Sequence, residues 1–497
     1  MKRRTNLVVE LLVKRWPVVV CITMLASLVL VLFLGKGQDV WFDEGYSIIL
    51  AQQPVDELLR LTGVDAHPPL FYLVLKAWGS VFGWTELSLR MLSALLATAT
   101  VGVVALLVRR LFTARVALAV LPFLVLAPFW LRYGYEIRMY ALAGLIGALA
   151  SLVLLRAVST GADRRWWGLY GVLVALGMYT LYMTAVIWLA HLVWLLIYHR
   201  RRFWRQPWFW SYALAGLLLL PYVSTIIYQL THSALPGIGW VLNLTHIGEV
   251  ASILLIYTPE WSVVGWSALG VLTVIGLSMY LFDRVRHQST AAMRQSLGFI
   301  TCLAVVPFLF FLLISLPMSQ PFFIPRYLAH TSLFIYALLG VIVALGWQVG
   351  YRKASFVLGS LSLLLLGWGV GQLAQAGNFN FERMQRPQTV KVSQQIDCKK
   401  SVIIADDAYT YMNDYYYLGN CDMRFYSPQP LWFSGGYAWL ANSSDRLAQS
   451  SDLKAERIVH LYWNNLQPAF RPDDRYRLVS SVTHDRQVTD TYELRAE

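Results

Sequence analysis

Apolar stretches long enough to cross a lipid bilayer recur along the first three quarters of the chain. A membrane-spanning helix needs about 17–25 predominantly apolar residues. Stretches of this kind lie at 17–34, 91–108, 116–131, 139–155, 168–180, 182–198, 211–229, 262–282, 297–316, 327–346 and 354–371. The pattern predicts a polytopic α-helical membrane protein with about 11 transmembrane helices.

The apolar stretch from 168 to 198 carries no charge and is compatible with one long helix or with two short ones. Arginines flank both of its ends, and cytoplasmic loops of membrane proteins are enriched in Lys and Arg. Both ends are therefore expected on the cytoplasmic side. We predict a hairpin that turns near Tyr179–Thr184.

The hydrophobic pattern changes at the end of the last apolar stretch, where a polar tail occupies residues 372–497. The runs Ser401–Ala405, Arg457–Trp463, Tyr476–Thr483 and Val488–Leu494 alternate or are rich in β-formers, and Ala408–Leu418 reads as a helix. We therefore divide the chain into a transmembrane domain at 1–371 and a small extracytoplasmic α/β domain at 372–497.

Three outer segments are more than simple connections. The first outer loop, 35–90, is too long for a turn and too amphipathic for a linker, so we expect interfacial helices there. Its anchors at the membrane surface would be Trp41, Trp78 and Trp84. The second segment, Thr231–Trp261, is expected to contain another interfacial helix, and the third is the short stretch Pro317–Tyr327.

The distribution of charge explains the formal net charge of +13. With a cytoplasmic N-terminus, the cytoplasmic segments hold 20 of the 41 basic residues and three acidic ones, and the rest of the chain is slightly acidic. This is the bias that membrane insertion produces. It predicts a multi-pass protein of the cell membrane with the tail outside, and it makes nucleic acid an unsuitable partner.

Two of the four cysteines lie in apolar stretches, and the other two lie in the polar tail. Cys21 and Cys302 lie in apolar stretches and are expected to pack as small hydrophobic residues. Cys398 and Cys421 lie in the outer tail, where oxidation is permitted. A disulfide and two unpaired thiols both remain open for this second pair, whereas its spacing does not suit a metal site.

The first outer loop carries two adjacent carboxylates and a histidine among aromatic residues. It reads WFDEGY around Asp43 and Glu44, and HPPLFY begins at His67. Adjacent side chains on a helix point about 100° apart, so we expect only one of the two carboxylates to face a substrate. The alternative for either is a helix cap.

A second cluster, RYGYEIRMYAL, follows the third apolar stretch. On one helix Arg132, Glu136 and Tyr140 would share a face, and Tyr135 and Arg138 another. Basic residues are disfavoured on the outer side, and the guanidinium fork binds phosphate in a bidentate manner. The cluster predicts phosphate recognition, with contact to lipid headgroups as the alternative.

The third cluster, PRYL, places Arg326 at the outer mouth of the tenth apolar stretch. His330 lies one turn deeper. The sequence is compatible with convergence of the three clusters on one cavity but does not by itself establish it.

In this order, the three clusters and the polar outer tail resemble the GT-C membrane glycosyltransferases. The resemblance is to the group that contains protein mannosyltransferases and the bacterial aminoarabinose and lipopolysaccharide-sugar transferases. It covers most of the chain in the order and spacing of its parts and rests on about 20 residues. Where the aminoarabinose transferases have a Lys before the Pro, this chain has His67, so the identity of the substrate does not transfer.

The resemblance implies transfer of a sugar from a polyprenyl-phosphate carrier to a glycolipid, polysaccharide or protein of the cell envelope. The location agrees, because nucleotide sugars are made in the cytosol whereas these carboxylates are outside. The expected catalytic residues are Asp43, the general base of a single displacement, and Glu44. We expect His67, Arg132, Arg138 and Arg326 to bind the donor phosphate and Tyr135, Tyr140 and Tyr327 to line the substrate pocket.

A divalent metal ion is used by some relatives, and Asp43 or Glu44 would hold it here. Three other functions remain open. A lipid-sugar ligase or polymerase of another fold would lack the early Asp-Glu loop, and a transporter or flippase would place charges at mid-membrane and show paired repeats. A non-enzymatic assembly protein is the third.

Overall fold

The computed structural model describes residues 9–36, 38–160, 163–200, 207–232, 244–258, 265–316, 323–376, 396–429, 435–440, 443–453, 455–464, 466–484 and 487–495. The chain divides into two compact units. We call Met1–Lys36, Arg90–Val223 and Pro236–Ala376 the helical unit, and Gly37–Leu89, Ser224–Leu235 and Gly377–Glu497 the loop–tail unit.

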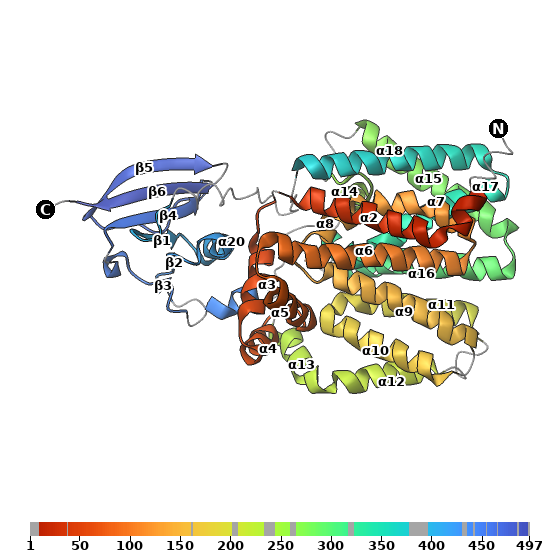
Figure 1. Cartoon of the computed structure of the whole chain (residues 1–497), viewed down its shortest axis with the longest axis horizontal. Coiled ribbons are helices and arrows are strands. Elements are labelled where there is room, and N and C mark those ends of the chain that lie inside the picture. Colours follow the sequence, from red (N-terminus) through yellow and green to blue (C-terminus); the bar gives the residue numbers. More distant parts are fainter. Residues whose placement is uncertain are drawn as a thin grey trace. The chain divides into compact units, whose positions relative to one another are not determined.

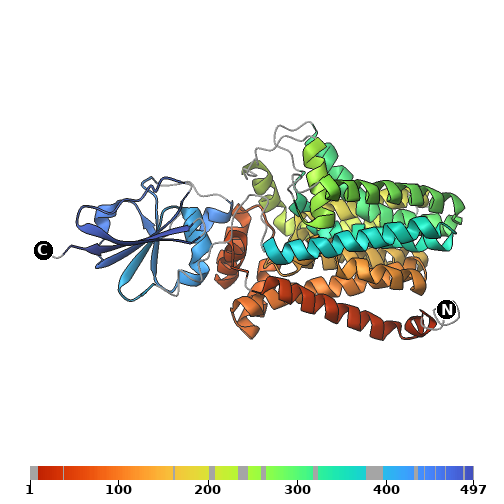
Figure 2. The same ribbon diagram turned by 90° about the horizontal axis from the view of Figure 1, so that it is seen from above.

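The long helices of the helical unit run side by side (Figures 1 and 2). They are α2 (Trp16–Gly35), α6 (Glu86–Leu111), α7 (Ala114–Val125), α9 (Tyr140–Thr160), α10 (Arg164–Thr180), α11 (Ala185–Tyr198), α12 (Trp208–Leu219), α15 (Gly265–Gln288), α16 (Ala291–Ser315), α17 (Ser332–Gln348) and α18 (Arg352–Ala376). Shorter pieces of this unit are α8 (Pro128–Gly134), η3 (Leu220–Tyr222), α14 (Leu244–Ile256) and η5 (Pro325–Thr331). Helix α13 (Val223–His232) belongs, except for its first residue, to the loop–tail unit.

Within the described residues, eight helices are long and apolar enough to cross a membrane, or nine if α7 and α8 form one bent span. The protein is therefore a multi-pass membrane protein. Helix α10 has 17 residues, and the apolar helix Tyr182–Tyr198 is also short. The expected number of 11 spans stays a prediction.

The predicted turn within 168–198 is confirmed as a break between two helices. Helix α10 ends at Thr180, and Leu181 is extended with φ −160° and ψ 120°. The 3-10 turn η1 (Tyr182–Thr184) then leads into α11. The chain therefore forms two short helices here rather than one long one.

A buried polar network joins the helices around this break. His191 lies between the Ser151 and Tyr170 hydroxyls, with each ring nitrogen 2.9 Å from one hydroxyl oxygen. The Tyr170 hydroxyl is 3.0 Å from that of Tyr212, which donates to the Trp188 carbonyl at 3.1 Å. Such hydrogen bonds contribute to helix association in an apolar surrounding. The network links α9, α10, α11 and α12.

The first outer loop is helical, as predicted. It forms α3 (Phe42–Gln52), α4 (Val55–Val64) and α5 (Leu70–Phe82). The prolines at 54, 68 and 69 lie between these helices, where a residue without an N–H costs no helical hydrogen bond. The helix expected in the second outer segment is α14.

The tail folds into a six-stranded sheet of order β3-β2-β1-β4-β6-β5. The strands are β1 (Ser401–Ala405), β2 (Asp422–Tyr426), β3 (Arg446–Leu447), β4 (Arg457–Trp463), β5 (Tyr476–His484) and β6 (Gln487–Leu494). The first four are parallel, and β6 pairs antiparallel with β4 and β5. Helix α20 (Ala408–Leu418) connects β1 to β2 and packs on the sheet (Figure 1). The predicted helix and four strands are confirmed, whereas β2 and β3 were missed.

The tail is stabilised by an apolar core and by a disulfide. Ile404, Leu447, Leu453, Ile458, Phe470 and Tyr476 are buried together. Cys398 and Cys421 form a disulfide with their Cα atoms 4.9 Å apart. The bridge ties the segment before β1 to the start of β2, and it resolves the question that the sequence left open.

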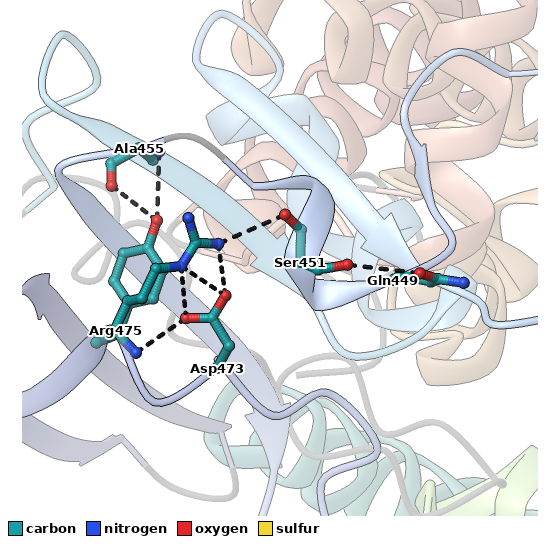
Figure 3. Close-up of polar contacts among 6 residues, drawn as sticks. Gln449, Ser451, Ala455, Asp473 and Arg475 are labelled. Carbon is teal, nitrogen blue, oxygen red and sulfur yellow. Dashed lines mark hydrogen bonds and ion pairs between the residues drawn. The ribbon is translucent and has the colours of Figure 1, made fainter.

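The entry to β5 is fixed to the segment before β4 (Figure 3). Arg475 Nε lies 2.9 Å from Asp473 Oδ2, and its NH2 group donates to the Ser451 carbonyl at 3.5 Å. The Tyr476 hydroxyl donates to the Ala455 carbonyl at 2.8 Å. The ion pair is exposed and screened by solvent, so the buried ring of Tyr476 is the stronger anchor.

Candidate functional site

Asp43 and Glu44 lie in the first turn of α3, in different surroundings. Glu44 is fully buried, and its Oε2 is 3.4 Å from the Trp41 amide nitrogen, as in half of a capping box. Asp43 is only partly buried. The capping role that the sequence allowed for either carboxylate therefore falls to Glu44, and the role of Asp43 towards a substrate stays a prediction.

His67 lies in the turn between α4 and α5, beside a buried carboxylate. Its Nδ1 is 3.0 Å from Oδ2 of Asp65, whose side chain is 4% exposed. A carboxylate on one ring nitrogen fixes the orientation and tautomer of a histidine. Contact with a substrate would then fall to Nε2. Asp65 was not predicted from the sequence, although its position two residues before His67 was a usable signal.

The C-terminal end of α3 is capped by a lysine from α5. Lys76 Nζ donates to the Gln53 carbonyl at 2.7 Å and to the Ala51 carbonyl at 3.4 Å. A positive charge at this end of a helix is favourable because the last carbonyls lack helical partners. The Tyr46 and Tyr72 rings pack edge to face 6.1 Å apart. Helix α3 is thus held along α5.

In the helical unit, the Arg132 cluster does not form one helix, which corrects the expected arrangement of two helix faces. Helix α8 ends at Gly134, residues 135–139 are irregular, and α9 begins at Tyr140. The axes of α7 and α8 differ by 64°, with Pro128 at the start of α8. Proline interrupts the hydrogen bonds of a continuing helix, and glycine is a poor helix former.

Arg132 and Glu136, which were expected on one helix face, are nevertheless close together. Arg132 NH1 and Glu136 Oε2 are 3.4 Å apart, and both side chains are buried. Arg138 is also buried, at 2% exposure, and its amide donates to the Glu136 carbonyl at 2.7 Å. Charges are rarely buried in a membrane protein without a partner or a function. This bend therefore remains the strongest candidate site of the helical unit.

The PRYL segment forms η5, which packs against α8 and α9. Arg326 is partly buried there, and His330 Nε2 lies 3.0 Å from the Met183 carbonyl oxygen. The second and third clusters thus come together, as the sequence allowed. Residues 317–322 of the third outer segment lie outside the described residues.

The three tyrosines expected to line a pocket pack against neighbouring elements. Tyr135 is fully buried against Gly35 of α2, where a Cβ on the glycine would lie 2.9 Å from the tyrosine Cβ. Tyr140 packs edge to face on Tyr133 at 4.7 Å. Tyr327 is partly buried, 5.8 Å from the ring of Phe311. Their role towards a substrate stays a prediction.

Tyr257 is a candidate site residue that was not predicted from the sequence. It follows α14 with φ +50°, a left-handed conformation that is a genuine outlier for a bulky residue. Its side chain is buried close to Arg132. Strained backbone of this kind gathers at functional sites. No pattern in the sequence indicated this position.

Asp43, Glu44 and His67 belong to the loop–tail unit, whereas Arg132, Arg138 and Arg326 belong to the helical unit. That both groups serve one cavity stays a prediction. Among the described residues, no group of three His, Cys, Asp or Glu side chains could hold a metal ion. A metal ion held by Asp43 or Glu44 stays a prediction.

Comparison with known proteins shows which families and structures this chain resembles. Residues 66–228 match the family model described as dolichyl-phosphate-mannose-protein mannosyltransferase. No curated protein matches the sequence. Among solved structures, ArnT from Cupriavidus metallidurans bound to undecaprenyl phosphate is 14% identical with a TM-score of 0.60, over 96% of this chain and 98% of that one. The same protein in the apo state gives 13% identity and a TM-score of 0.62, with the same coverage.

A second solved structure has the same architecture within a larger chain. The arabinofuranosyltransferase AftD from mycobacteria is 15% identical with a TM-score of 0.54, over 97% of this chain and 40% of that one. The protein therefore has the fold of the GT-C membrane glycosyltransferases, as the sequence resemblance predicted.

Proposed function

We propose that the protein transfers a sugar from a polyprenyl-phosphate-linked donor to a cell-envelope acceptor on the extracytoplasmic face. The observation that carries this proposal is the difference between the two carboxylates of α3, where Glu44 is fully buried as a cap and Asp43 is only partly buried. A lipid-linked donor is supported by the undecaprenyl phosphate that accompanies the similarly folded ArnT.

In the proposed reaction, the acceptor hydroxyl attacks the anomeric carbon of the donor sugar. Asp43 takes the hydroxyl proton as a new C–O bond forms. The bond from the anomeric carbon to the phosphate oxygen breaks, and polyprenyl phosphate leaves with the bonding electrons. General-base help of this kind typically contributes about 10²–10⁴-fold.

The departing phosphate needs positive charge or hydrogen-bond donors near it. Arg138 and Arg326 are the candidates in the helical unit, because Arg132 is already paired with Glu136. His67, oriented by Asp65, is the candidate in the loop–tail unit. The tail and the first outer loop would both lie outside the membrane, and the N-terminus in the cytoplasm.

The test is a transfer assay with purified protein in lipid nanodiscs and a mixed-sugar panel of polyprenyl-phosphate donors. Release of polyprenyl phosphate in step with formation of a glycosylated envelope acceptor is the expected result. Nucleotide sugars supplied to the same preparation should give no product. Transfer from a nucleotide sugar, with none from any lipid-linked donor, would contradict the proposal.

A further inference from the structure

Helix α20 of the tail packs on two sides. Tyr411 faces the sheet, with its ring 5.4 Å from Phe425 of β2. On another side α20 packs against α3 of the first outer loop, within the same compact unit. Buried residues therefore surround much of this 11-residue helix, which is unusual for a helix that covers only a sheet.

The aromatic ring next to Asp43 is held by the tail. Phe42 stacks on Tyr409 of α20, with ring centroids 5.1 Å apart and an interplanar angle of 11°. On another side it meets Tyr437, at 5.1 Å and 52°. Rings in such contact have few orientations open to them. The residue immediately before Asp43 is thereby fixed.

The residue two positions after Asp43 is a glycine that lets two helices meet at their backbones. A Cβ on Gly45 would lie 2.9 Å from the Met412 carbonyl oxygen of α20. Carbon atoms do not come this close to a backbone oxygen, so any side chain at Gly45 would push α3 away from α20. The lack of a side chain is thus a requirement of the contact.

The last turn of α20 holds both ends of the first outer loop. The Val40 amide, just before α3, donates to the Tyr417 hydroxyl oxygen at 2.7 Å. That hydroxyl is 3.5 Å from Oε2 of Glu86, at the start of α6. The neighbouring Tyr416 hydroxyl donates to the Trp84 carbonyl at 3.2 Å.

We propose that α20 is the positioning element of the catalytic loop, acting through Tyr417 and Gly45 to hold Asp43 in its reacting orientation. The inference rests on the proposed role of Asp43 as the base. Its contacts at positions 40, 42 and 45 lie on both sides of Asp43, and those at 84 and 86 hold the far end of the loop. Misplacement of a reacting group by about 1 Å can cost about 10²-fold in rate.

Two variants test the proposal, each with a matched control. Gly45→Ala pushes α3 off α20, and Gly63→Ala in α4 adds a methyl group only 3.7 Å from its nearest neighbour, an ordinary contact. Tyr417→Phe removes one hydroxyl, and Tyr415→Phe removes another from the same helix, for which the described residues offer no hydrogen-bond partner. Should Gly45→Ala fail to fold, the tyrosine pair still gives the answer.

The variants Gly45→Ala and Tyr417→Phe should lower kcat at least about tenfold, with KM for the lipid donor changed less than about threefold. Hydrogen exchange in residues 38–52 should become faster in both, and the control variants should match the wild type. Faster exchange with unchanged kcat would overturn the proposal, because α20 would then only stabilise the loop. Unchanged exchange and kcat would overturn it as well.

A double variant separates this proposal from the proposed function. If Gly45 acts through Asp43, adding Gly45→Ala to Asp43→Asn should cost no further activity. A full additional loss would refute positioning through Asp43. Full activity of Asp43→Asn alone would instead refute the proposed role of Asp43 as the general base.

Discussion

The buried carboxylate of Asp406 offers a quantitative test of how the tail is held together. It follows β1 and accepts hydrogen bonds from the Ala469 and Phe470 amides at 3.0 and 2.8 Å. His460 Nε2 of β4 lies 2.9 Å from the same group. Asp406 thus joins two central strands to the segment that precedes β5.

Replacing Asp406 with Asn should destabilise the tail, because an amide has one acceptor oxygen and turns its NH2 group towards amide donors. Each buried donor left without an acceptor costs about 1–3 kcal/mol, so we expect a loss of about 2–4 kcal/mol. Hydrogen exchange of the β1 amides in the full-length protein should then accelerate by about thirtyfold to several hundredfold.

The effect should also depend on pH. Burial raises the pKa of Asp406, but the bonds from His460 and the two amides outweigh it and hold the pKa below its ordinary value of 3.8. A lowered pKa means stability that is present above pH 3.8 and lost as the pH falls through the folded-state value. The advantage of wild type over Asp406→Asn should therefore be constant near neutrality and shrink below pH 3.8.

The control is Asp422→Asn, which breaks only an exposed pair with Arg424 and should cost less than about 1 kcal/mol. Equal exchange rates in wild type and Asp406→Asn would refute the account of this hydrogen-bond cluster. So would an advantage of the wild type that persisted undiminished far below pH 3.8.

Two further predictions concern topology and the donor phosphate. Reporter insertions after Gln53 and after Ser444 should both report an extracytoplasmic location, and a cytoplasmic signal from either would break the argument for a lipid-linked donor. Changing Arg138 or Arg326 to Lys should lower transfer at least about tenfold, because a point charge cannot reproduce a bidentate fork. Wild-type transfer by both Lys variants would favour headgroup contact instead.

The sequence predicts those elements whose pattern is long and regular. Helix α20 and strand β4 have the predicted bounds because their apolar positions repeat clearly. Strand β3 has two residues and so carries no pattern, and β2 mixes Asp422 and Arg424 with apolar residues. Strand β2 pairs with the edge of β1, and β3 pairs with β2 in turn, so both form through tertiary contacts.

Some features of the candidate site could likewise be predicted from the sequence, and others could not. Helix geometry predicted that only one of Asp43 and Glu44 would face a substrate, but the full burial of Glu44 comes from packing. The spacing placed Arg132 and Glu136 on one face of a single helix, and the two are close together although the helix ends at Gly134. The left-handed backbone of Tyr257 has no local signal at all, since tyrosine does not favour that conformation.

The central claim is that Asp43 is the general base, and one comparison tests it most directly. Asp43→Asn keeps the size of the side chain and its ability to accept a hydrogen bond but removes the base. Purified Asp43→Asn should bind the polyprenyl-phosphate sugar nearly as well as wild type and transfer it about 10²–10⁴-fold more slowly. Glu44→Gln should retain most of the activity, since glutamine also serves in a capping box. Full transfer by Asp43→Asn, or a greater loss in Glu44→Gln, would contradict the claim.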